Sequence, residues 1–297
     1  MRPDRGACRG PPRHSVIRMV DQLTVRVRRR TGPHMAHVHA HVDRDALCTK
    51  RFCTTRRTGV LDVAHDLRPE EMSDDLAELL ATELDDSGVL RGQPEFEAVF
   101  TGVIESTLDD DGGDPWYRFY RNSVDRLERG DAAFAPIHEH AASLVIGNEI
   151  IDLGSCFGFF PLRAAAAGLT VTATDLSAPT MRLLDRMSVR LRRPLRTIGC
   201  NATTVPLAAG AADTVTVLHL LEHVDTVTAD AILDEAVRLA RRRVIVAVPF
   251  EEVPRACYGH VQRFDMGALC AIADARRATV ARARAHEFHG GWLVLDR

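Results

Sequence analysis

Hydrophobic and polar positions follow two different periods along the chain, and the pattern changes near residue 140. Beyond that point, short apolar runs alternate with stretches in which apolar residues recur with the period of an amphipathic helix. We expect strands at residues 149–153, 169–174, 195–200, 214–218, 244–248, 279–283 and 292–295. We expect helices between them at residues 158–167, 178–191, 228–240 and 265–277. Strands that alternate with helices predict crossover connections and a mostly parallel sheet.

The last two predicted strands are joined by residues 286–291, which end in Gly290 and Gly291. A link this short holds no crossover helix, so it can only join antiparallel strands. The pattern therefore predicts an α/β fold with a seven-stranded, mostly parallel sheet whose last strand is antiparallel.

Before residue 140 the apolar positions predict helices. Residues 68–108 hold two amphipathic helices, the first with an apolar face of Met72, Leu76, Leu79, Leu80 and Leu84, the second with Phe96, Val99, Phe100, Val103 and Ile104. Residues 115–120 are the densest aromatic segment and open a helix that runs to about residue 127, and another helix is expected at 131–144. We expect residues 61–139 to be a helical N-terminal extension of a domain at 140–297.

Charge separates the first 57 residues from the rest. The chain has 297 residues, 38 basic and 41 acidic, but residues 1–57 hold 14 basic and 4 acidic residues. Such an arm can bind phosphates, yet its single aromatic residue, Phe52, gives no platform for stacking bases. We expect residues 1–60 to be a basic arm that is poorly ordered or loosely strand-forming, with short alternating runs at 23–27 and 37–42, and expect no nucleic-acid partner. The alternating His37, His39 and His41 could bind zinc, although exposed histidines are the favoured interpretation.

Apolar runs and cysteine spacing limit the class of protein further. No apolar stretch approaches the roughly 20 residues that cross a bilayer, and no secretory apolar region follows the first charges. We therefore expect a cytoplasmic protein without a transmembrane segment, with its seven cysteines reduced. No two cysteines have the C-x-x-C spacing of a zinc ribbon or a redox motif.

The most informative segment runs from a strand through a glycine-rich turn into a helix: Asp152-Leu-Gly154-Ser-Cys156-Phe-Gly158. Its spacing excludes the G-x-G-x-x-G dinucleotide fingerprint, the lysine-containing P-loop and the G-x-S-x-G esterase turn. Asp175 ends the next predicted strand, and the carboxyl ends of strands are where open α/β sheets bind ligands. Two carboxylates beside a glycine turn favour a nucleoside that carries a positive group.

At these residues the chain resembles the class I S-adenosylmethionine-dependent methyltransferases, which have a Rossmann-like fold. Cys156 replaces the middle glycine of the family's first motif, and Asp175 stands where the family binds ribose. Cys200-Asn201-Ala202 replaces an Asp-Ala that holds adenine, and residues 212–223 match the fourth-strand motif. The resemblance covers residues 140–297 and implies a donor site of Asp152, Gly154, Ser155, Cys156, Gly158, Asp175, Leu176, Asn201, Ala202 and His219.

Residues 116–122 and 152–161 are also similar to the methyltransferases encoded with the mycofactocin system of actinobacteria, which methylate the oligosaccharide of that redox cofactor. This similarity implies a glucose hydroxyl as acceptor and a glycan or glycosylated small molecule as partner. A small molecule, a lipid or a quinone remains an alternative acceptor, and a non-catalytic donor-binding scaffold is a further alternative. The Asn/Asp-Pro-Pro-Tyr motif of base methylation is replaced by residues 219–222. The sequence does not determine the oligomeric state.

Methylation of a hydroxyl benefits from a general base, because the hydroxyl is a poor nucleophile until it loses its proton. The candidate bases are His219 and His223, which follow the fourth strand of the domain, and His260, which follows the fifth. The alternative is a packing or loop role for His219 and a structural hydrogen bond for His223, and His260 could instead bind the substrate. The candidates for contacting the acceptor are aromatic: Trp116, Tyr117, Tyr120 and Tyr258. Packing into the core is the alternative for the aromatic helix. The sequence supplies no metal-ligand set around these residues.

Overall fold

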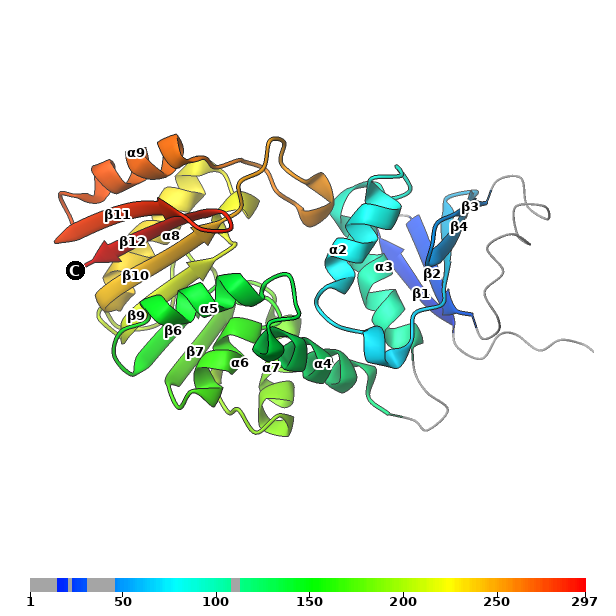
Figure 1. The fold of residues 1–297 in the computed structure, drawn as a ribbon, viewed down its shortest axis with the longest axis horizontal. Coiled ribbons are helices and arrows are strands. Elements are labelled where there is room, and N and C mark those ends of the chain that lie inside the picture. Colours follow the sequence, from blue (N-terminus) through cyan, green and yellow to red (C-terminus); the bar gives the residue numbers. More distant parts are fainter. Residues whose placement is uncertain (1–14, 21–22, 31–45, 108–112) are drawn as a thin grey trace, which may run out of the picture. The chain divides into compact units, whose positions relative to one another are not determined.

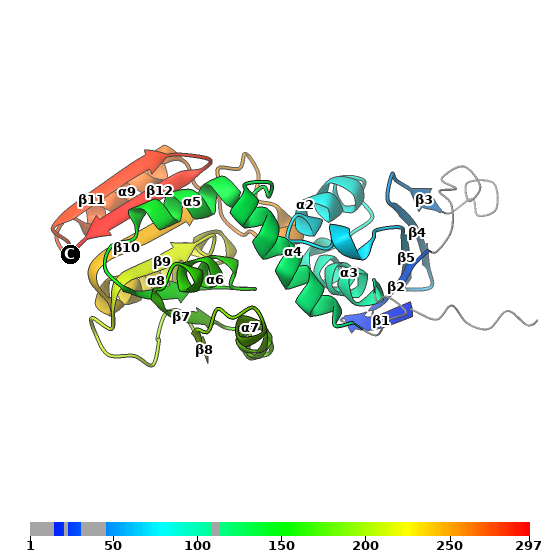
Figure 2. The same ribbon diagram turned by 60° about the horizontal axis from the view of Figure 1, so that its bottom comes forward.

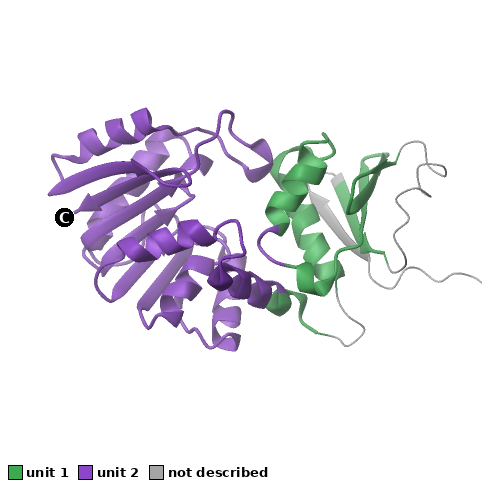
Figure 3. Cartoon of the chain, in the orientation of Figure 1, with its two compact units in different colours: residues 1–72, 76–118 green, residues 73–75, 119–297 purple. Residues whose placement is uncertain are grey.

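The computed structural model describes residues 15–20, 23–30, 46–107 and 113–297, so His37, His39 and His41 lie outside the described residues. The chain divides into two compact units (Figure 3). The first extends to residue 72 and includes residues 76–118; the second comprises residues 73–75 and 119–297. The division falls at residues 118 and 119, within a helix, whereas the sequence pattern placed it at residue 139.

The second unit contains the predicted seven-stranded sheet (Figure 1). Its strand order is β11-β12-β10-β9-β6-β7-β8. Five neighbouring strands are parallel to one another: β10, β9, β6, β7 and β8. Strand β12 is antiparallel to both of its neighbours, β10 and β11. The strands are β6 (Glu149–Leu153), β7 (Thr170–Asp175), β8 (Arg196–Gly199), β9 (Ala212–Leu218), β10 (Ala240–Val248), β11 (Arg282–Glu287) and β12 (Gly291–Asp296). The predicted Rossmann-like fold with an antiparallel last strand is confirmed.

Side chains alternate between the two faces of this sheet, as they must in strands. On β10, Val244 and Val246 lie in a core with α8 (Thr226–Leu239) and α9 (Met266–Arg276). The intervening Ile245 and Ala247 lie in a second core with α5 (Ala135–Leu144) and α6 (Phe159–Ala166). Because both faces are covered, the central strands read as continuous apolar runs, and this is why the sequence located them well. Helix α7 (Ala178–Arg190) packs against β7 and β8 at the edge (Figure 2).

Strand β11 is the one element of this sheet that the pattern misplaced. Residues 279–283 were expected to be the strand, but Thr279 and Val280 still donate backbone hydrogen bonds to Arg276 at the end of α9. The strand begins at Arg282, which pairs with Asp296 of β12. As an edge strand with arginines at alternate positions, β11 lacks the apolar run by which a buried strand is recognised.

The first unit corrects the expectation of a poorly ordered arm, within the described residues. It holds a five-stranded sheet of order β1-β2-β5-β4-β3, in which only β2 and β5 are parallel. The strands are β1 (Ser15–Val20), β2 (Leu23–Arg29), β3 (Leu47–Cys48), β4 (Phe52–Arg57) and β5 (Val60–His65). Val25 and Val27 are fully buried, and Arg26 and Arg28 are the exposed alternate positions of the same strand. The arginines of this segment thus belong to a half-buried strand.

The helices of the first unit cover this sheet. The two expected amphipathic helices are present as α2 (Leu76–Leu80), continued by a π-helical turn η2 (Ala81–Asp85), and as α3 (Gly92–Ser106). Before them, η1 (Pro69–Glu71) is a single 3₁₀ turn. Helix α3 lies against β2 so closely that a Cβ on Gly102 would come within 2.6 Å of Val27 Cγ2. The unit is therefore a mixed α/β structure and not only helical.

Cys48 and Cys53 form a disulfide, so the expectation that all seven cysteines are reduced is wrong for this pair. The two residues face each other in the register of β3 and β4, which brings their sulfur atoms together. Among the described residues, Cys156, Cys200, Cys257 and Cys270 do not take part in a disulfide. No helix in the described parts of the chain has the length and apolar character needed to cross a membrane.

Candidate active site

The glycine-rich turn after β6 depends on backbone conformations that glycine supplies. Gly154 and Gly158 have φ values of +71° and +74°, where an L side chain is strained. A Cβ on Gly154 would lie 2.7 Å from Leu220 Cδ1, and one on Gly158 would lie 2.4 Å from Leu184 Cδ2. Ser155 ties the turn to β7, because its N–H donates to the Thr174 carbonyl at 2.8 Å. The turn thus keeps backbone exposed at the carboxyl edge of the sheet.

Asp152 lies behind this turn and is 3 % exposed. Its Oδ1 accepts a short hydrogen bond from Thr216 Oγ1 on the neighbouring β9. Burial raises the pKa of Asp152 to about 6, against the opposing effect of the Thr216 hydrogen bond. The Asp152 carboxylate therefore joins β6 to β9 beneath the glycine-rich turn of residues 154–158, the donor turn. This position suits a residue that shapes the turn.

Asp175 stands at the end of β7 and faces the same turn. Its Oδ2 accepts the Cys156 N–H at 2.9 Å, and its Oδ1 accepts the Ser177 N–H at 2.8 Å. A carboxylate has about four acceptor positions, so each oxygen can still accept a ribose hydroxyl. The adjacent Leu176 is 79 % exposed, an apolar surface that a nucleobase can cover. These features fit the ribose and the adenine of S-adenosylmethionine.

Asn201 is arranged differently from its predicted role as an acceptor for the adenine amino group. Its Oδ1 already accepts from the Thr203 N–H at 2.9 Å and from the Thr203 hydroxyl at 3.0 Å. Both acceptor positions of an amide oxygen are thereby used. Ala202 packs against the core of the sheet. An adenine contact from Asn201 would therefore come from its amide nitrogen or would require those bonds to open.

His219 directly follows β9 and is held in an unusual backbone conformation. Its φ of +52° lies in the left-handed region, which costs a non-glycine residue about 1–3 kcal/mol. Its N–H donates to the Ala247 carbonyl at 2.9 Å, and its ring meets Phe134 edge-on at 5.1 Å between centroids. Its Nδ1 is 3.1 Å from Glu222 Oε1. The fold maintains this strained residue with its imidazole against a carboxylate that is 1 % exposed.

The other two predicted bases lie together. His223 ends the 3₁₀ turn η3 (Leu221–His223), and its ring centroid is 4.8 Å from that of His260. The segment after η4 (Ala256–Tyr258) is docked on η3, because Val261 N–H donates to the Glu222 carbonyl at 2.8 Å. The protein around His223 lowers its pKa, first through desolvation of the ring. His260, which is distant in sequence, thus joins His219 and His223 around Glu222.

Two carboxylates of this cluster were missed or given another role by the sequence. Glu251 follows the end of β10 by three residues, and its Oε2 lies 2.8 Å from Nδ1 of His260. The sequence placed Glu222 after the fourth strand without a partner, and the structure gives it a histidine partner. A usable signal existed for Glu251, since it follows the carboxyl end of a buried parallel strand, the same edge that carries Asp175 and His219.

The aromatic candidates separate into buried and untested residues. Tyr120 is fully buried against Phe119, Phe157 and Phe159, which fits the alternative of packing into the core, and its acceptor contact stays a prediction. Its helix α4 (Pro115–Arg129) turns its aromatic face into the core. Tyr258 lies beside His260, with ring centroids 5.6 Å apart. Trp116 and Tyr117 belong to the first unit, and their acceptor contacts stay predictions.

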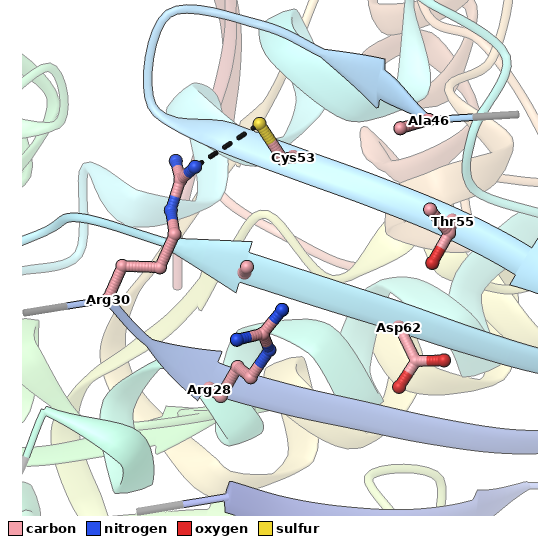
Figure 4. Close-up of a pocket in the computed structure, with 7 residues that line it drawn as sticks. Arg28, Arg30, Ala46, Cys53, Thr55 and Asp62 are labelled. Atoms are coloured by element: carbon pink, nitrogen blue, oxygen red, sulfur yellow. Dashed lines mark hydrogen bonds between the residues drawn. The ribbon is translucent and has the colours of Figure 1, made fainter. Parts of the chain in front are cut away.

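A pocket of about 140 Å³ lies on the sheet of the first unit (Figure 4). Arg28, Arg30 and Asp62 are among its lining residues, together with Ala46, Cys53, Thr55 and Ala64. One guanidinium nitrogen of Arg30 donates to Cys53 Sγ at 3.3 Å. None of these residues is a predicted site residue, so this pocket is separate from the methyltransferase motifs.

Comparisons with known proteins agree with the strand order and the glycine turn. Residues 151–248, about a third of the chain, match the family described as Methyltransferase domain. A comparison with curated protein sequences gives no match. Similar solved structures include an S-adenosylmethionine-dependent methyltransferase from Aquifex aeolicus, 12 % identical, which covers 59 % of this chain and 97 % of its own with a TM-score of 0.44.

Magnesium protoporphyrin IX methyltransferase from Synechocystis with bound S-adenosylmethionine is a further similar structure. It is 19 % identical, covers 63 % of this chain and 85 % of its own, and has a TM-score of 0.42. These TM-scores are below 0.5. Residues 151–248 thus match a methyltransferase domain, and they lie in a sheet with the Rossmann-like strand order described above.

Proposed function

We propose that the protein is an O-methyltransferase that methylates a sugar hydroxyl, and that the sugar is a glucose of the mycofactocin oligosaccharide. The observation that supports O-methylation is the pairing of His219 with buried Glu222 at the same sheet edge as the donor turn. A carboxylate that holds one imidazole nitrogen leaves the other free to take a proton. Such a base is what a hydroxyl acceptor needs.

The chain's own residues act on the acceptor and on the position of the donor. When bound, S-adenosylmethionine supplies an activated methyl group on a sulfonium. Asp175 and the turn at Gly154 hold the nucleoside, which fixes the direction of approach. If Nδ1 of His219 carries the proton that Glu222 Oε1 accepts, Nε2 has a lone pair for the hydroxyl proton. The carboxylate then stabilises the imidazolium that forms.

The proposed acceptor comes from sequence similarity. Residues 116–122 and 152–161 carry the likeness to mycofactocin methyltransferases. Of these, Asp152, Gly154 and Gly158 belong to the donor turn and indicate the donor alone. The sequence of residues 116–122 supports the mycofactocin oligosaccharide as the acceptor. The assignment of the acceptor therefore rests on this segment.

The test is incubation of full-length protein with S-adenosylmethionine and a panel of acceptors, followed by mass spectrometry. The panel holds glucosylated mycofactocin, a simple glucoside, a quinol and a lipid alcohol. We expect one added methyl group on a glucose residue of the mycofactocin glycan, and loss of transfer in His219→Ala protein. Methylation of the quinol or lipid alone would overturn the sugar assignment. Donor binding without transfer to any acceptor, and without effect of His219→Ala, would support a donor-binding scaffold.

A further inference from the structure

We propose that Glu222, His223 and His260 form a binding site for one divalent transition-metal ion. One ligand atom from each of these side chains lies within 4.8 Å of the other two. Glu222 and His223 come from the turn after β9, and His260 comes from the segment docked on that turn through the Val261–Glu222 backbone hydrogen bond. The grouping therefore depends on the fold, not on sequence spacing.

The first argument is an orphaned carboxylate oxygen. Glu222 is 1 % exposed, and while its Oε1 is 3.1 Å from His219 Nδ1, its Oε2 has no hydrogen-bond partner. A buried charged oxygen without a partner is strongly unfavourable. A cation next to Oε2, shared with two imidazoles, would satisfy it. The cluster is thus completed by a positive ligand.

The second argument is the orientation of His260. Its Nδ1 is 2.8 Å from Glu251 Oε2, and a carboxylate at Nδ1 favours a proton there. The Nε2 atom is then an acceptor, as a metal requires. Metal-bound histidines nearly always donate their second nitrogen to a carboxylate, a carbonyl or water, which fixes the tautomer and the ring. Glu251 supplies that arrangement for His260 and is a positioning residue.

Ligand types and access define which ion fits. Two imidazoles and one carboxylate suit Zn²⁺ and the ions that resemble it, and sites of this type keep positions open for other ligands. With bonds of about 2.0–2.2 Å in tetrahedral geometry, two ligand atoms lie about 3.3–3.6 Å apart, so the widest pair of the cluster needs to close by up to about 1.3 Å. His223 is exposed, which gives the ion a route of entry.

Such an ion would assist the reaction proposed above, and this consequence rests on that proposed function. The acceptor oxygen would bind an open position of the ion, which favours loss of its proton. The proton goes to His219 Nε2 and then to water. The oxygen lone pair forms the bond to the methyl carbon, and the carbon–sulfur electron pair stays on sulfur. The products are a methyl ether and S-adenosylhomocysteine.

The test is direct metal binding by the full-length protein. Every protein in this test carries Ala in place of His37, His39 and His41, so that these imidazoles do not add to the metal bound. Each protein is first freed of metal with a chelator. Calorimetry with Zn²⁺ and absorption spectroscopy with Co²⁺ then measure stoichiometry and affinity. We expect one equivalent to bind, and binding to weaken at least about 100-fold in Glu222→Gln, His223→Ala or His260→Ala. The loss of a carboxylate that holds a metal-binding histidine costs about 10–100-fold in metal affinity, and this is the range expected for Glu251→Gln.

Two matched variants and a second ligand serve as controls. Glu252→Gln removes the carboxylate of an exposed residue next to Glu251, and His289→Ala removes the imidazole of an exposed histidine outside the cluster. Both variants should bind the metal ion as tightly as the parent protein does. Titration with S-adenosylmethionine checks that each variant is folded. The metal site would be overturned if the parent protein bound no stoichiometric metal ion. It would also be overturned if the variants of Glu222, His223 and His260 bound the ion as tightly as the parent. Metal binding without sugar methylation would instead overturn the proposed function and leave the site in place.

Discussion

Glu222 Oε1 and His219 Nδ1 lie 3.1 Å apart at the carboxyl edge of the sheet, with the glutamate almost fully buried. The contact holds the imidazole of His219, whose backbone is strained at φ +52°, against the carboxyl group of Glu222. Because natural folds retain such strain chiefly at functional positions, His219 is the residue of the cluster that we expect to contact the acceptor hydroxyl.

The first prediction concerns His219→Asn. Asparagine tolerates the left-handed backbone better than most residues but supplies no base near neutral pH. We expect kcat to fall by about 10²–10⁴, the usual contribution of a positioned base, while the melting temperature stays close to that of the parent. Methyl-transfer kinetics and thermal unfolding measure the two effects. An activity within a factor of three of the parent would contradict the role of His219 as base.

The second prediction concerns the ribose carboxylate. Asp175→Asn replaces one acceptor oxygen by an NH₂ group, which would face the N–H of Cys156 or of Ser177. Two donors then oppose each other, and hydrogen bonds to a charged acceptor, worth about 1.5–3 kcal/mol each, are lost. We expect the Kd for S-adenosylmethionine to rise by about 10–100-fold in calorimetry. Asp185→Asn on the exposed face of α7 is the control and should bind the donor normally.

The third prediction separates backbone strain from collision at the donor turn. Gly158 and Gly168 both have positive φ, +74° and +83°, so alanine strains the backbone at either position by about 1–2 kcal/mol. A Cβ at Gly168 meets nothing within 4 Å, whereas one at Gly158 meets the buried Leu184. Overpacking adds about 1–3 kcal/mol. Urea unfolding should show Gly158→Ala as the less stable variant; equal losses would show that Leu184 moves aside freely.

The fourth prediction is a pH dependence in the first unit. His65 is fully buried; its Nδ1 accepts the Leu67 N–H, and its Nε2 is 2.8 Å from Ser106 Oγ. Burial lowers the pKa of His65 to about 3, from 6.5. The unfolded chain takes up the proton below pH 6.5 while the folded chain does not, so stability is lost as pH falls from 6.5 toward 3.

At pH 5 this difference amounts to 1.5 pH units, about 2 kcal/mol. Hydrogen exchange of amides in β5 and α3 should therefore speed up between pH 7.5 and pH 5, after correction for the intrinsic rate. In His65→Gln protein, which has no titrating ring, the corrected rates should change less. An identical acid response in the variant would assign the effect to other groups.

Much of the second unit could be predicted from sequence, because its central strands are buried on both faces and its glycine turn has a fixed spacing. Strand β6 was predicted with its observed bounds, Glu149–Leu153. The first unit was misjudged for the opposite reason. The alternating arginines of β2 indicated a basic arm, and only tertiary packing of Val27 against α3 shows that their strand is half buried.

The sequence located several residues of the candidate site one by one, but it missed Glu251 and did not predict the cluster. The position of Asp175 after its strand follows from periodicity, and so does that of His219. The grouping of Glu222 with His260 follows from a backbone bond between Val261 and Glu222, and no local pattern encodes such a contact. The burial of Tyr120 likewise depends on Phe157 and Phe159 of the donor turn, which become its neighbours only in the folded unit.

The measurement that tests the central claim most directly is a calorimetric titration of the intact protein with S-adenosylmethionine. A donor site built from the glycine turn and Asp175 predicts one molecule bound per chain with a micromolar Kd, near −8 kcal/mol. Affinity should drop sharply in Asp175→Ala protein. A folded wild-type protein that binds no S-adenosylmethionine, or an Asp175→Ala variant that binds it as tightly as the parent, would contradict this account.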